Sequence, residues 1–239
     1  PFSRGAHIHY MDRPPTASAL MPALAKVRPT VMASVPLIME KIYRGKIVPT
    51  FQKKAITRKL YGWDWSRKLL HRIAGKQLMK LFGGRMRLFA IGGAKFDSEA
   101  ERFLYEAKFP YGIGYGLTET APLVAGCVGK MVRIGSTGPA LPAVNIRLDD
   151  INPETGQGEI VVNTPCCMKG YYKNDEATQA AFTKDGWFRT GDLGALSKDG
   201  WIYIKGRLKN MIVGPSGENI YPEDIENVIN QHVTVSESL

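Results

Sequence analysis

Cysteine and long apolar runs are both scarce in this chain of 239 residues. Its three cysteines are Cys127, Cys166 and Cys167, and the last two are adjacent in the sequence. Adjacent cysteines seldom bridge each other, and the spacing of the three fits no zinc site. No stretch reaches the roughly 20 consecutive apolar residues that a membrane-spanning helix needs. These absences argue against a disulfide scaffold, a zinc protein and an integral membrane protein, and they favour reduced thiols.

The first residues, PFSRGAHIHYMDRPP, contain no initiator Met. They also lack the apolar run and the small-residue cleavage site of a signal peptide. We therefore expect a cytoplasmic protein, and we expect this chain to be an internal piece of a longer one. The hydrophobic content of 44% is enough for a well-buried core and for more than one structural unit.

Acidic side chains are scarce between Lys41 and Arg87, where Asp64 is opposed by fourteen Lys and Arg residues. Apolar residues recur at helical spacing among these cations, namely Ile56, Leu60, Trp63, Leu70 and Ile73. Three interpretations stay open: an amphipathic helix with its charged face in water, a helix in peripheral contact with an anionic membrane, and a patch that attracts polyanions. No nucleic-acid motif accompanies the charge, so we expect no nucleic-acid partner.

Strand-like and helical patterns alternate in the first half of the chain. The segments AHIHYM, PTVMASV, RMRLFAIGGA and YGIGYG have the pattern of strands, and SALMPALAKV, PLIMEKIY and FDSEAERFLYEAKF have that of helices. Pro36 suits the first turn of its helix, and Asp97 or Ser98 suits the cap of the last one. This alternation predicts an α/β subdomain over residues 1–120, with a layered, mostly parallel sheet covered by helices.

The pattern changes from about residue 121, where helical periodicity ends and Gly and Pro separate short strands. Lys198-Asp199-Gly200 lies between two of these strands and predicts a hairpin turn. We therefore expect a β-rich, barrel-like subdomain over residues 121–205. Residues 206–239 predict a hinge and the start of a small α+β C-terminal domain, in which a helix begins after Pro222.

Polar residues gather where two predicted strands end, at Gly92-Gly93-Ala94 and at Tyr115 to Thr120. Ligands bind beyond the carboxyl ends of the strands in an open parallel sheet. Paired glycines let a flat ring lie against the backbone, and the ring of Tyr115 can cover the other face of a purine. Thr118 offers a hydroxyl to a phosphate oxygen, and Glu119 offers a hard oxygen ligand for Mg²⁺. The alternative is a polar loop with Glu119 in water.

The segment GIGYG superficially resembles the dinucleotide fingerprint G-x-G-x-x-G through Gly112, Gly114 and Gly116. Its last spacing is one residue short, and the LTETAPLVAG that follows is a poor start for a helix that would hold a pyrophosphate. We reject a dinucleotide site on these grounds.

A second polar cluster, GWFRTGDLG, places Asp192 between two glycines at the head of a predicted hairpin. A carboxylate in that position can bind the two hydroxyls of a ribose, although a turn Asp is the simpler interpretation. Arg207 and Lys209 follow in IKGRLKN, at the predicted domain junction. Arg207 can pair with ribose or phosphate oxygens, and the simpler interpretation makes both residues solvated cations of a linker.

The order of these motifs carries a resemblance that no single motif does. YGLTET, GEIVV followed by GYY, GWFRTGDLG, YIKGRLKN and GENIYPEDIE together resemble the successive core motifs of the ANL adenylate-forming superfamily. The likeness covers nearly the whole chain from VRPTVMASVPLIMEKIY onward. Within the superfamily the chain looks most like bacterial long-chain fatty-acid:CoA ligases. This resemblance implies ATP-dependent activation of a fatty acid through an acyl-adenylate to acyl-CoA, with ATP, Mg²⁺ and CoA taking part.

The resemblance also implies roles for matched residues. Gly92, Gly93 and Ala94 would line the adenine pocket, Tyr115 would stack on the base, and Gly116 belongs to the same cofactor-binding motif. Thr118 would touch phosphate, and Glu119 would hold Mg²⁺. Asp192 would bind the ribose hydroxyls, Arg207 would contact ribose or phosphate, and Lys209 would lie at the hinge of the C-terminal domain. Gly217 would lie on a loop that moves in for thioester formation.

Two elements of the superfamily have no match in these residues. The Ser/Thr/Gly-rich phosphate loop that ends in Lys would precede residue 1, and the catalytic lysine of the C-terminal domain would follow Leu239. Asn210 also stands where many relatives carry Asp. Since losing one phosphate-binding donor costs about 100- to 1,000-fold in rate, we expect the isolated chain to have little or no activity. The alternatives are another acyl or aryl acid ligase and a non-catalytic, basic module that binds a membrane surface.

Overall fold

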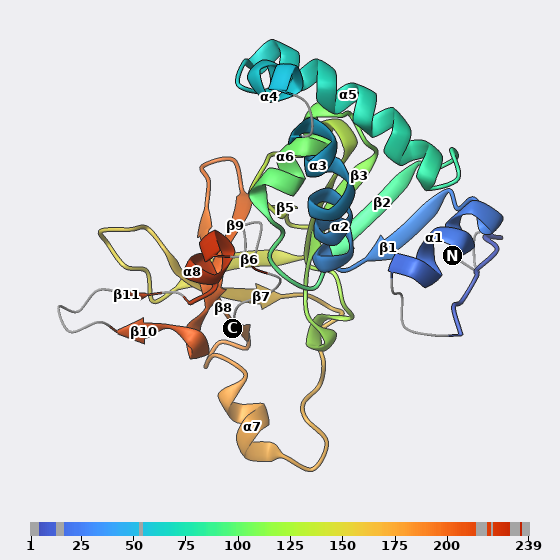
Figure 1. The fold of residues 1–239 in the computed structure, drawn as a ribbon. Coiled ribbons are helices and arrows are strands. Elements are labelled where there is room, and N and C mark those ends of the chain that lie inside the picture. Colours follow the sequence, from blue (N-terminus) through green and yellow to red (C-terminus); the bar gives the residue numbers. More distant parts are fainter. Residues whose placement is uncertain are drawn as a thin grey trace. The chain divides into compact units, whose positions relative to one another are not determined.

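A computed structural model describes residues 5–12, 17–52, 55–213, 219–220, 222–229 and 235. The chain forms two compact units (Figure 1). Unit 1 consists of Pro1–Ala90 and Glu99–Tyr111, and unit 2 consists of Ile91–Ser98 and Gly112–Leu239. Every residue of the predicted nucleotide site belongs to unit 2, and the basic segment 41–87 belongs to unit 1.

A four-stranded sheet has the strand order β1-β2-β3-β4, with β1 at Val31–Ser34, β2 at Leu88–Gly92, β3 at Tyr111–Tyr115 and β4 at Ala125–Val128. Helices separate β1 from β2 and β2 from β3, which is the pattern of crossover connections. Strands β3 and β4 are antiparallel, with Tyr115 opposite Ala125. The sheet is therefore mixed, and the predicted α/β class is confirmed.

The helices of unit 1 are mostly short. Their bounds are α1 at Ala17–Val27, α2 at Pro36–Ile42, α3 at Val48–Gln52, α4 at Ala55–Tyr61, α5 at Asp64–Leu81 and α6 at Ser98–Glu106, with a π-helical turn η2 at Tyr43–Ile47. Pro36 begins α2, as predicted, because its missing N–H costs nothing in a first turn. Phe82, Phe89 and Phe109 pack edge to face in the core of this unit, with ring centroids 5.4 to 6.3 Å apart.

A buried polar network joins α5 to α6 within unit 1. Arg67 makes two hydrogen bonds to the Glu106 carboxylate, at 3.1 and 2.8 Å. The Nδ1 atom of His71 lies 2.8 Å from Glu106 Oε2, out of line for a straight hydrogen bond. Its Nε2 atom lies 2.9 Å from the hydroxyl of Tyr61. Burial lowers the pKa of His71, although Glu106 beside it acts in the opposite direction.

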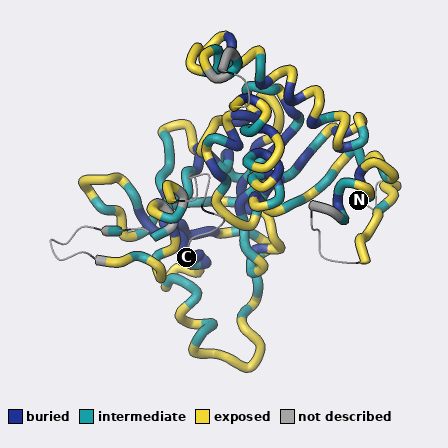
Figure 2. Tube along the Cα trace, viewed as in Figure 1, coloured by how far each residue is buried: buried dark blue, intermediate teal, exposed yellow. Residues whose placement is uncertain are grey.

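Unit 2 is built on a five-stranded antiparallel sheet in the order β5-β9-β8-β7-β6. The strands are β5 at Gly138–Pro139, β6 at Asn145–Asp149, β7 at Gly158–Asn163, β8 at Phe188–Leu196 and β9 at Trp201–Arg207. Five consecutive residues of β7 are buried. Figure 2 colours buried parts of the chain dark blue. The hydrophobic core cluster of unit 2 contains Tyr115, Val124, Ala125, Ile160, Val162 and Ile202.

Shorter elements complete unit 2. They are the 3₁₀ turns η3 at Thr118–Thr120, η4 at Gly129–Met131 and η5 at Leu208–Asn210, helix α7 at Asp175–Ala180, strands β10 at Ile212–Val213 and β11 at Asn219–Ile220, and helix α8 at Pro222–Ile229. Helix α8 begins at Pro222, where the sequence predicts a helix. The β8–β9 connection is the predicted hairpin, closed by the Gly200 N–H donating to the Ser197 carbonyl at 2.9 Å.

Two sequence-based expectations are wrong. Residues 6–11, AHIHYM, form no strand. In the described part of the chain the β-rich region is an open sheet with β5 and β6 at its edges, and no closed barrel is found there. Alternating apolar residues predict strands, but they do not determine whether the last strand pairs with the first. The domain boundaries near residues 120 and 206 stay predictions.

Candidate nucleotide site

Tyr115 ends β3, and the loop that follows it folds back tightly. A Cβ atom on Gly116 would collide with the backbone carbonyl of Pro122, so only glycine fits at this position. The buried side chain of Thr120 closes the loop, because its hydroxyl accepts from the Leu117 N–H at 3.1 Å. The sequence YGLTET therefore forms a compact turn at the end of the strand.

Three residues far apart in the sequence meet at the end of this strand. The hydroxyl of Tyr115 donates to Asp192 Oδ2 at 2.7 Å. The Nε atom of Arg207 lies 3.0 Å from the other carboxylate oxygen, Oδ1. Asp192 is 5% exposed, whereas the Arg207 side chain is 58% exposed. The carboxylate is thus held from two sides, and each oxygen still has lone pairs to accept from a ligand hydroxyl.

Strand register places Asp192 beside Arg207, because the two residues are direct partners in the β8–β9 pairing. The register shifts just after Asp192, between Leu193 and Gly194, and such irregularities commonly redirect side chains at functional sites. Thr190 anchors the strand to β7, since its hydroxyl donates to the Ile160 carbonyl at 2.7 Å and accepts from the Asp192 N–H at 3.1 Å.

A second buried carboxylate supports the same stretch of β8. Glu159, which is 6% exposed, accepts a hydrogen bond from the Gly191 N–H at 3.2 Å and forms an ion pair with Arg189. Gly191 has a φ of 69°, a conformation that favours glycine. In Thr190-Gly191-Asp192 the glycine therefore permits the backbone conformation. Asp192 is the residue whose side chain is able to bind a ligand.

The titration of the site follows from its burial. Burial raises the pKa of Asp192, while Tyr115 and Arg207 partly oppose that shift. Burial and the neighbouring Asp192 carboxylate raise the pKa of Tyr115 well above its usual range. Tyr115 is therefore a hydrogen-bond donor at every physiological pH, and it keeps Asp192 oriented as an acceptor.

The predicted adenine residues lie at the end of β2. A Cβ atom on Gly92 would come within 2.9 Å of the Gly114 carbonyl oxygen on β3, so the glycine permits the two strands to approach closely there. Gly93 has a φ of 90° and open space around its α-carbon, and both Gly93 and Ala94 are exposed. An uncovered stretch of backbone of this kind can accept a flat ring.

Glu119 lies in η3, four residues after Tyr115. Its Oε1 atom accepts a hydrogen bond from the hydroxyl of Tyr171 at 3.0 Å, and its carbonyl oxygen accepts from the Met168 N–H at 2.7 Å. Glu119 is half-buried and Thr118 beside it is exposed. Tyr171 therefore orients the carboxylate through one oxygen, and Met168 holds the backbone of the same residue.

The remaining predicted residues are less constrained. Lys209 lies in η5 and is exposed. Gly217 lies outside the described residues. Cys127, Cys166 and Cys167 are free thiols, as the sequence predicts. Among the described residues, no group of three or more His, Cys, Asp and Glu could hold a metal ion by itself.

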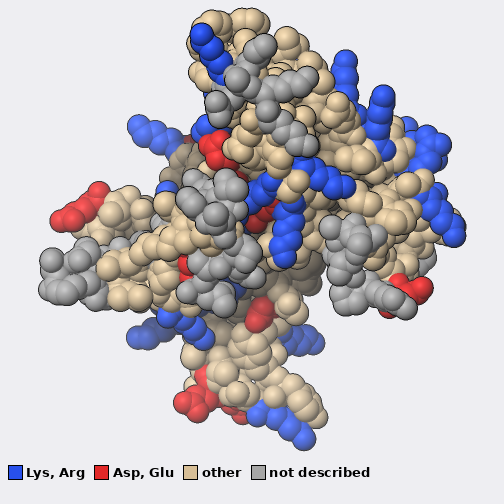
Figure 3. All heavy atoms as spheres, viewed as in Figure 1, with Lys and Arg blue, Asp and Glu red and all other residues tan. Residues whose placement is uncertain are grey.

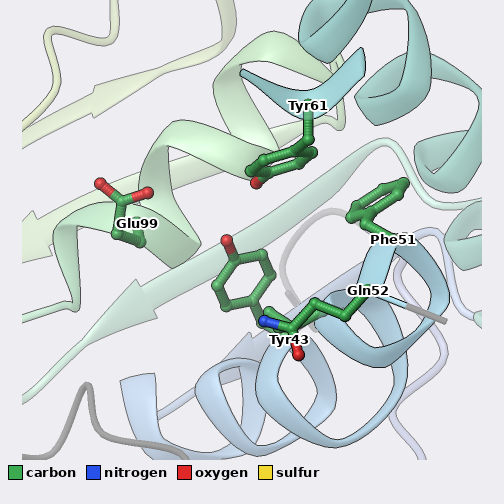
Figure 4. A pocket seen from close by; sticks show the side chains of 6 residues that line it. Tyr43, Phe51, Gln52, Tyr61 and Glu99 are labelled. Atoms are coloured by element: carbon green, nitrogen blue, oxygen red, sulfur yellow. The ribbon is translucent and has the colours of Figure 1, made fainter. Parts of the chain in front are cut away.

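Unit 1 contains a separate cavity of about 640 Å³ (Figure 4). It is lined by Tyr43, Val48, Phe51, Gln52, Tyr61 and Glu99. Tyr61 connects it to the buried network, because the hydroxyl of Tyr61 contacts His71. None of the residues of this cavity was singled out from the sequence, since their spacing is that of ordinary core positions.

The sequence analysis also did not identify Thr190, Glu159 and Tyr171. These residues form hydrogen bonds to Asp192, Gly191 and Glu119, respectively. All three lie within motifs used for the resemblance, GWFRTGDLG, GEIVV and GYY. A charged residue near the start of an apolar strand, such as Glu159 before IVV, is a signal that could have identified a buried partner. Tyr171 gives no such signal, because its partner Glu119 is distant in the sequence.

Comparison with known proteins decides the family. The family model for AMP-binding enzymes matches residues 1–172. The chain belongs to the AMP-binding enzyme family. The fold agrees, since the crystal structure of ATP-bound MatB from Rhodopseudomonas palustris matches with a TM-score of 0.68 and 28% sequence identity over 93% of this chain and 39% of that one.

Curated relatives of this AMP-binding chain include enzymes named as long-chain fatty acid–CoA ligases or long chain acyl-CoA synthetases. It is 32% identical to the long-chain-fatty-acid–CoA ligase FadD15 of Mycobacterium bovis, over 92% of this chain and 39% of that protein. It is 33% identical to the long chain acyl-CoA synthetase 1 of Arabidopsis thaliana, over 99% of this chain and 39% of that protein. The chain thus spans about two fifths of the length of these relatives.

Proposed function

We propose that this chain is the part of a long-chain fatty acid–CoA ligase that binds the adenine nucleotide. The observation that supports it best is the buried Asp192 carboxylate, oriented by Tyr115 and Arg207. In the proposed reaction the fatty carboxylate attacks the α-phosphate of ATP and releases pyrophosphate, which leaves an acyl-adenylate. The thiolate of CoA then attacks the acyl carbon and displaces AMP.

In this proposal Asp192 accepts hydrogen bonds from the two ribose hydroxyls. A carboxylate suits this task because it is acceptor-only and because charged hydrogen bonds are the stronger ones. Tyr115 takes two roles, covering the base with its ring and orienting Asp192 with its hydroxyl. Arg207 is exposed beyond Asp192 and contacts ribose or phosphate, while Gly92, Gly93 and Ala94 border the adenine.

The residues present fit a magnesium ion bound to the nucleotide. Glu119 offers a half-buried carboxylate, and its Oε1 atom is already oriented by Tyr171. Mg²⁺ takes oxygen ligands and commonly uses only one or two carboxylates together with substrate phosphates, so one such residue suffices. When bound, Mg²⁺ would neutralise charge on the phosphates. The exposed hydroxyl of Thr118, next in sequence, would bind a phosphate oxygen.

Catalysis would need groups besides those matched here. In this proposal Arg207 contacts the nucleotide, and Lys209 lies at the hinge of the C-terminal domain. Arg207 ends β9, and Lys209 follows two positions later in η5. We therefore propose the ligase activity for the whole protein, and we expect the isolated chain to bind nucleotide and to turn over little of it.

A second candidate function differs from the first in the acid that the enzyme activates. The chain is 34% identical to the 2-succinylbenzoate–CoA ligase of Listeria monocytogenes, over 68% of this chain and 34% of that protein. An aromatic acid ligase is therefore the alternative. A protein containing this sequence should release pyrophosphate with palmitate and CoA. Faster release with 2-succinylbenzoate than with palmitate would favour the alternative.

Nucleotide binding by the chain itself is the direct test. Mg²⁺ and ATP should raise its midpoint of thermal unfolding, since a ligand of the folded state stabilises it. Asp192→Ala should abolish that shift. If ATP leaves the midpoint of the parent chain unchanged, the chain is not a nucleotide site, and a non-catalytic module, cytoplasmic and in contact with membranes, becomes the better proposal.

A further inference from the structure

The outward side of α5 carries large apolar residues that no part of the described structure covers. Trp65, Leu69 and Ile73 are 64%, 52% and 51% exposed, and they follow one another at four-residue spacing along one face of the helix. Trp63, just before the helix, is 54% exposed. The opposite side of α5 is buried in unit 1, through Ser66, His71, Ala74, Gly75 and Leu78.

Cations share the exposed face with these apolar residues. Arg72 follows Leu69 by three positions and Lys76 follows Ile73 by three, so they lie on the same side of the helix. Lys68 and Lys80 are exposed as well. Figure 3 shows Lys and Arg side chains standing out along α5. The one acidic residue of the helix, Asp64, lies at its beginning, where it pairs with Arg67 and with Lys68.

We propose that this surface, made of Trp63, Trp65, Leu69 and Ile73 with Lys68, Arg72, Lys76 and Lys80, binds the surface of a bilayer that contains anionic lipid. Of the helices that the structure describes, none has the length and apolar character to span a bilayer. α5 instead lies in the plane of the interface. Its indole rings enter the headgroup region, which tryptophan favours, and its cations face the lipid phosphates.

A polyanion such as nucleic acid explains the cations but not the four exposed apolar side chains. A second protein chain explains the apolar residues, but a row of cations running through an apolar patch would then need matching acids. A membrane surface accommodates both, because Lys and Arg bury their aliphatic stems while their charged ends stay at the phosphates. The proposal is independent of the ligase activity.

Vesicle sedimentation with the 239-residue chain tests this proposal. Vesicles of phosphatidylcholine with phosphatidylglycerol should bind the chain, and vesicles of phosphatidylcholine alone should bind it far more weakly. The charge variant Arg72→Gln/Lys76→Gln/Lys80→Gln should weaken binding to the anionic vesicles about a hundredfold, at about fivefold for each cation. Its matched control, Lys130→Gln/Lys184→Gln/Lys198→Gln, removes three exposed lysines of unit 2 and should bind like the parent chain.

The apolar contribution has its own pair of variants. Trp65→Gln/Leu69→Gln/Ile73→Gln should weaken binding at least tenfold, whereas Met131→Gln/Ile134→Gln/Ile151→Gln, exposed in unit 2, should leave it unchanged. Quenching of tryptophan fluorescence by brominated lipid should occur in the parent chain. All the substituted positions are on the surface, and thermal unfolding checks that each variant is folded.

Several results would overturn the proposal. They are no binding to anionic vesicles, equal effects of the α5 variants and their controls, and no quenching by brominated lipid. Self-association of the parent chain that the apolar α5 variant abolishes, without vesicle binding, would instead assign the surface to a second copy. Binding to nucleic acid that the charge variant abolishes, again without vesicle binding, would assign it to a polyanion.

Discussion

The hydroxyl of Tyr115, at the end of β3, donates to the Asp192 carboxylate, in the middle of β8, at 2.7 Å and across 77 residues of sequence. Both side chains are buried, at 9% and 5% exposure. Burial raises the pKa of Tyr115, which keeps its phenol neutral, and the Tyr115 hydroxyl and Arg207 both act against the rise that burial causes in the pKa of Asp192, which favours the carboxylate as acceptor. The contact ties two parts of the proposed nucleotide site together before any ligand arrives.

The variant Asp192→Asn should lower the affinity for ATP without lowering the stability of the chain at neutral pH. A raised pKa means that the folded state favours the protonated carboxyl, so the contribution of Asp192 to stability is present below pH ~4 and is lost as the pH rises through its folded pKa. At neutral pH the neutral amide should therefore not lower the unfolding midpoint. Affinity for ATP should fall about 10- to 100-fold, because an amide replaces the charged acceptor.

Isothermal titration with ATP and thermal unfolding check this pair of effects. Asp175→Asn, at the exposed start of α7, is the control and should change neither quantity. An Asp192→Asn chain that binds ATP as tightly as the parent would remove Asp192 from the site.

Tyr171→Phe should weaken the magnesium-dependent part of nucleotide binding. Tyr171 donates to Glu119 Oε1 at 3.0 Å, so its loss frees the carboxylate to move. We expect the Mg²⁺ concentration needed for half-maximal ATP stabilisation to rise about 3- to 10-fold, as for one net hydrogen bond. Tyr172→Phe is the matched control, since Tyr172 is 88% exposed and adjacent in sequence. Equal effects of the two variants would contradict the proposed role of Tyr171.

Gly116→Ala should destabilise unit 2 by about 1–3 kcal/mol, the usual cost of forcing a group into a filled space. The added methyl group meets the Pro122 carbonyl, which belongs to the backbone and cannot rotate away. Gly45→Ala is the control, because a Cβ atom there meets nothing within 4 Å. Urea unfolding measures both, and an unchanged Gly116→Ala chain would mean that the loop is looser than described.

His71→Gln should flatten the pH dependence of stability in unit 1. Since burial lowers the pKa of His71, the folded state binds fewer protons than the unfolded state, and stability is lost as the pH falls below about 6.5. The variant should be less stable at every pH, because His71 packs on Phe51 and Phe103. Its free energy of unfolding should nevertheless fall less steeply between pH 7 and pH 5.

Urea unfolding across this pH range measures the slope for the parent chain and for His71→Gln. His9→Gln alters an exposed histidine and serves as the control. A slope that is the same in all three chains would show that other groups set the acid sensitivity.

Local chemistry made several elements predictable. Pro36 begins α2, Pro222 begins α8, and Gly200 closes the β8–β9 hairpin because proline and glycine restrict or permit particular backbone angles. The residues proposed for the nucleotide stay predictions, and they were selected because hydroxyls and carboxylates at strand ends are costly in a core. The expected barrel was wrong because closing a barrel depends on pairing between strands that are distant in the sequence.

The sequence by itself determined most of the strand and helix pattern, the family motifs and the basic, amphipathic character of segment 41–87. Only the tertiary structure decided that Tyr115 holds Asp192, that Tyr171 holds Glu119, and that Trp65, Leu69 and Ile73 face outward. Side-chain periodicity reports which residues share a face. Whether that face meets the core, a distant strand or the solvent depends on contacts between residues far apart in the chain, and no local pattern encodes them.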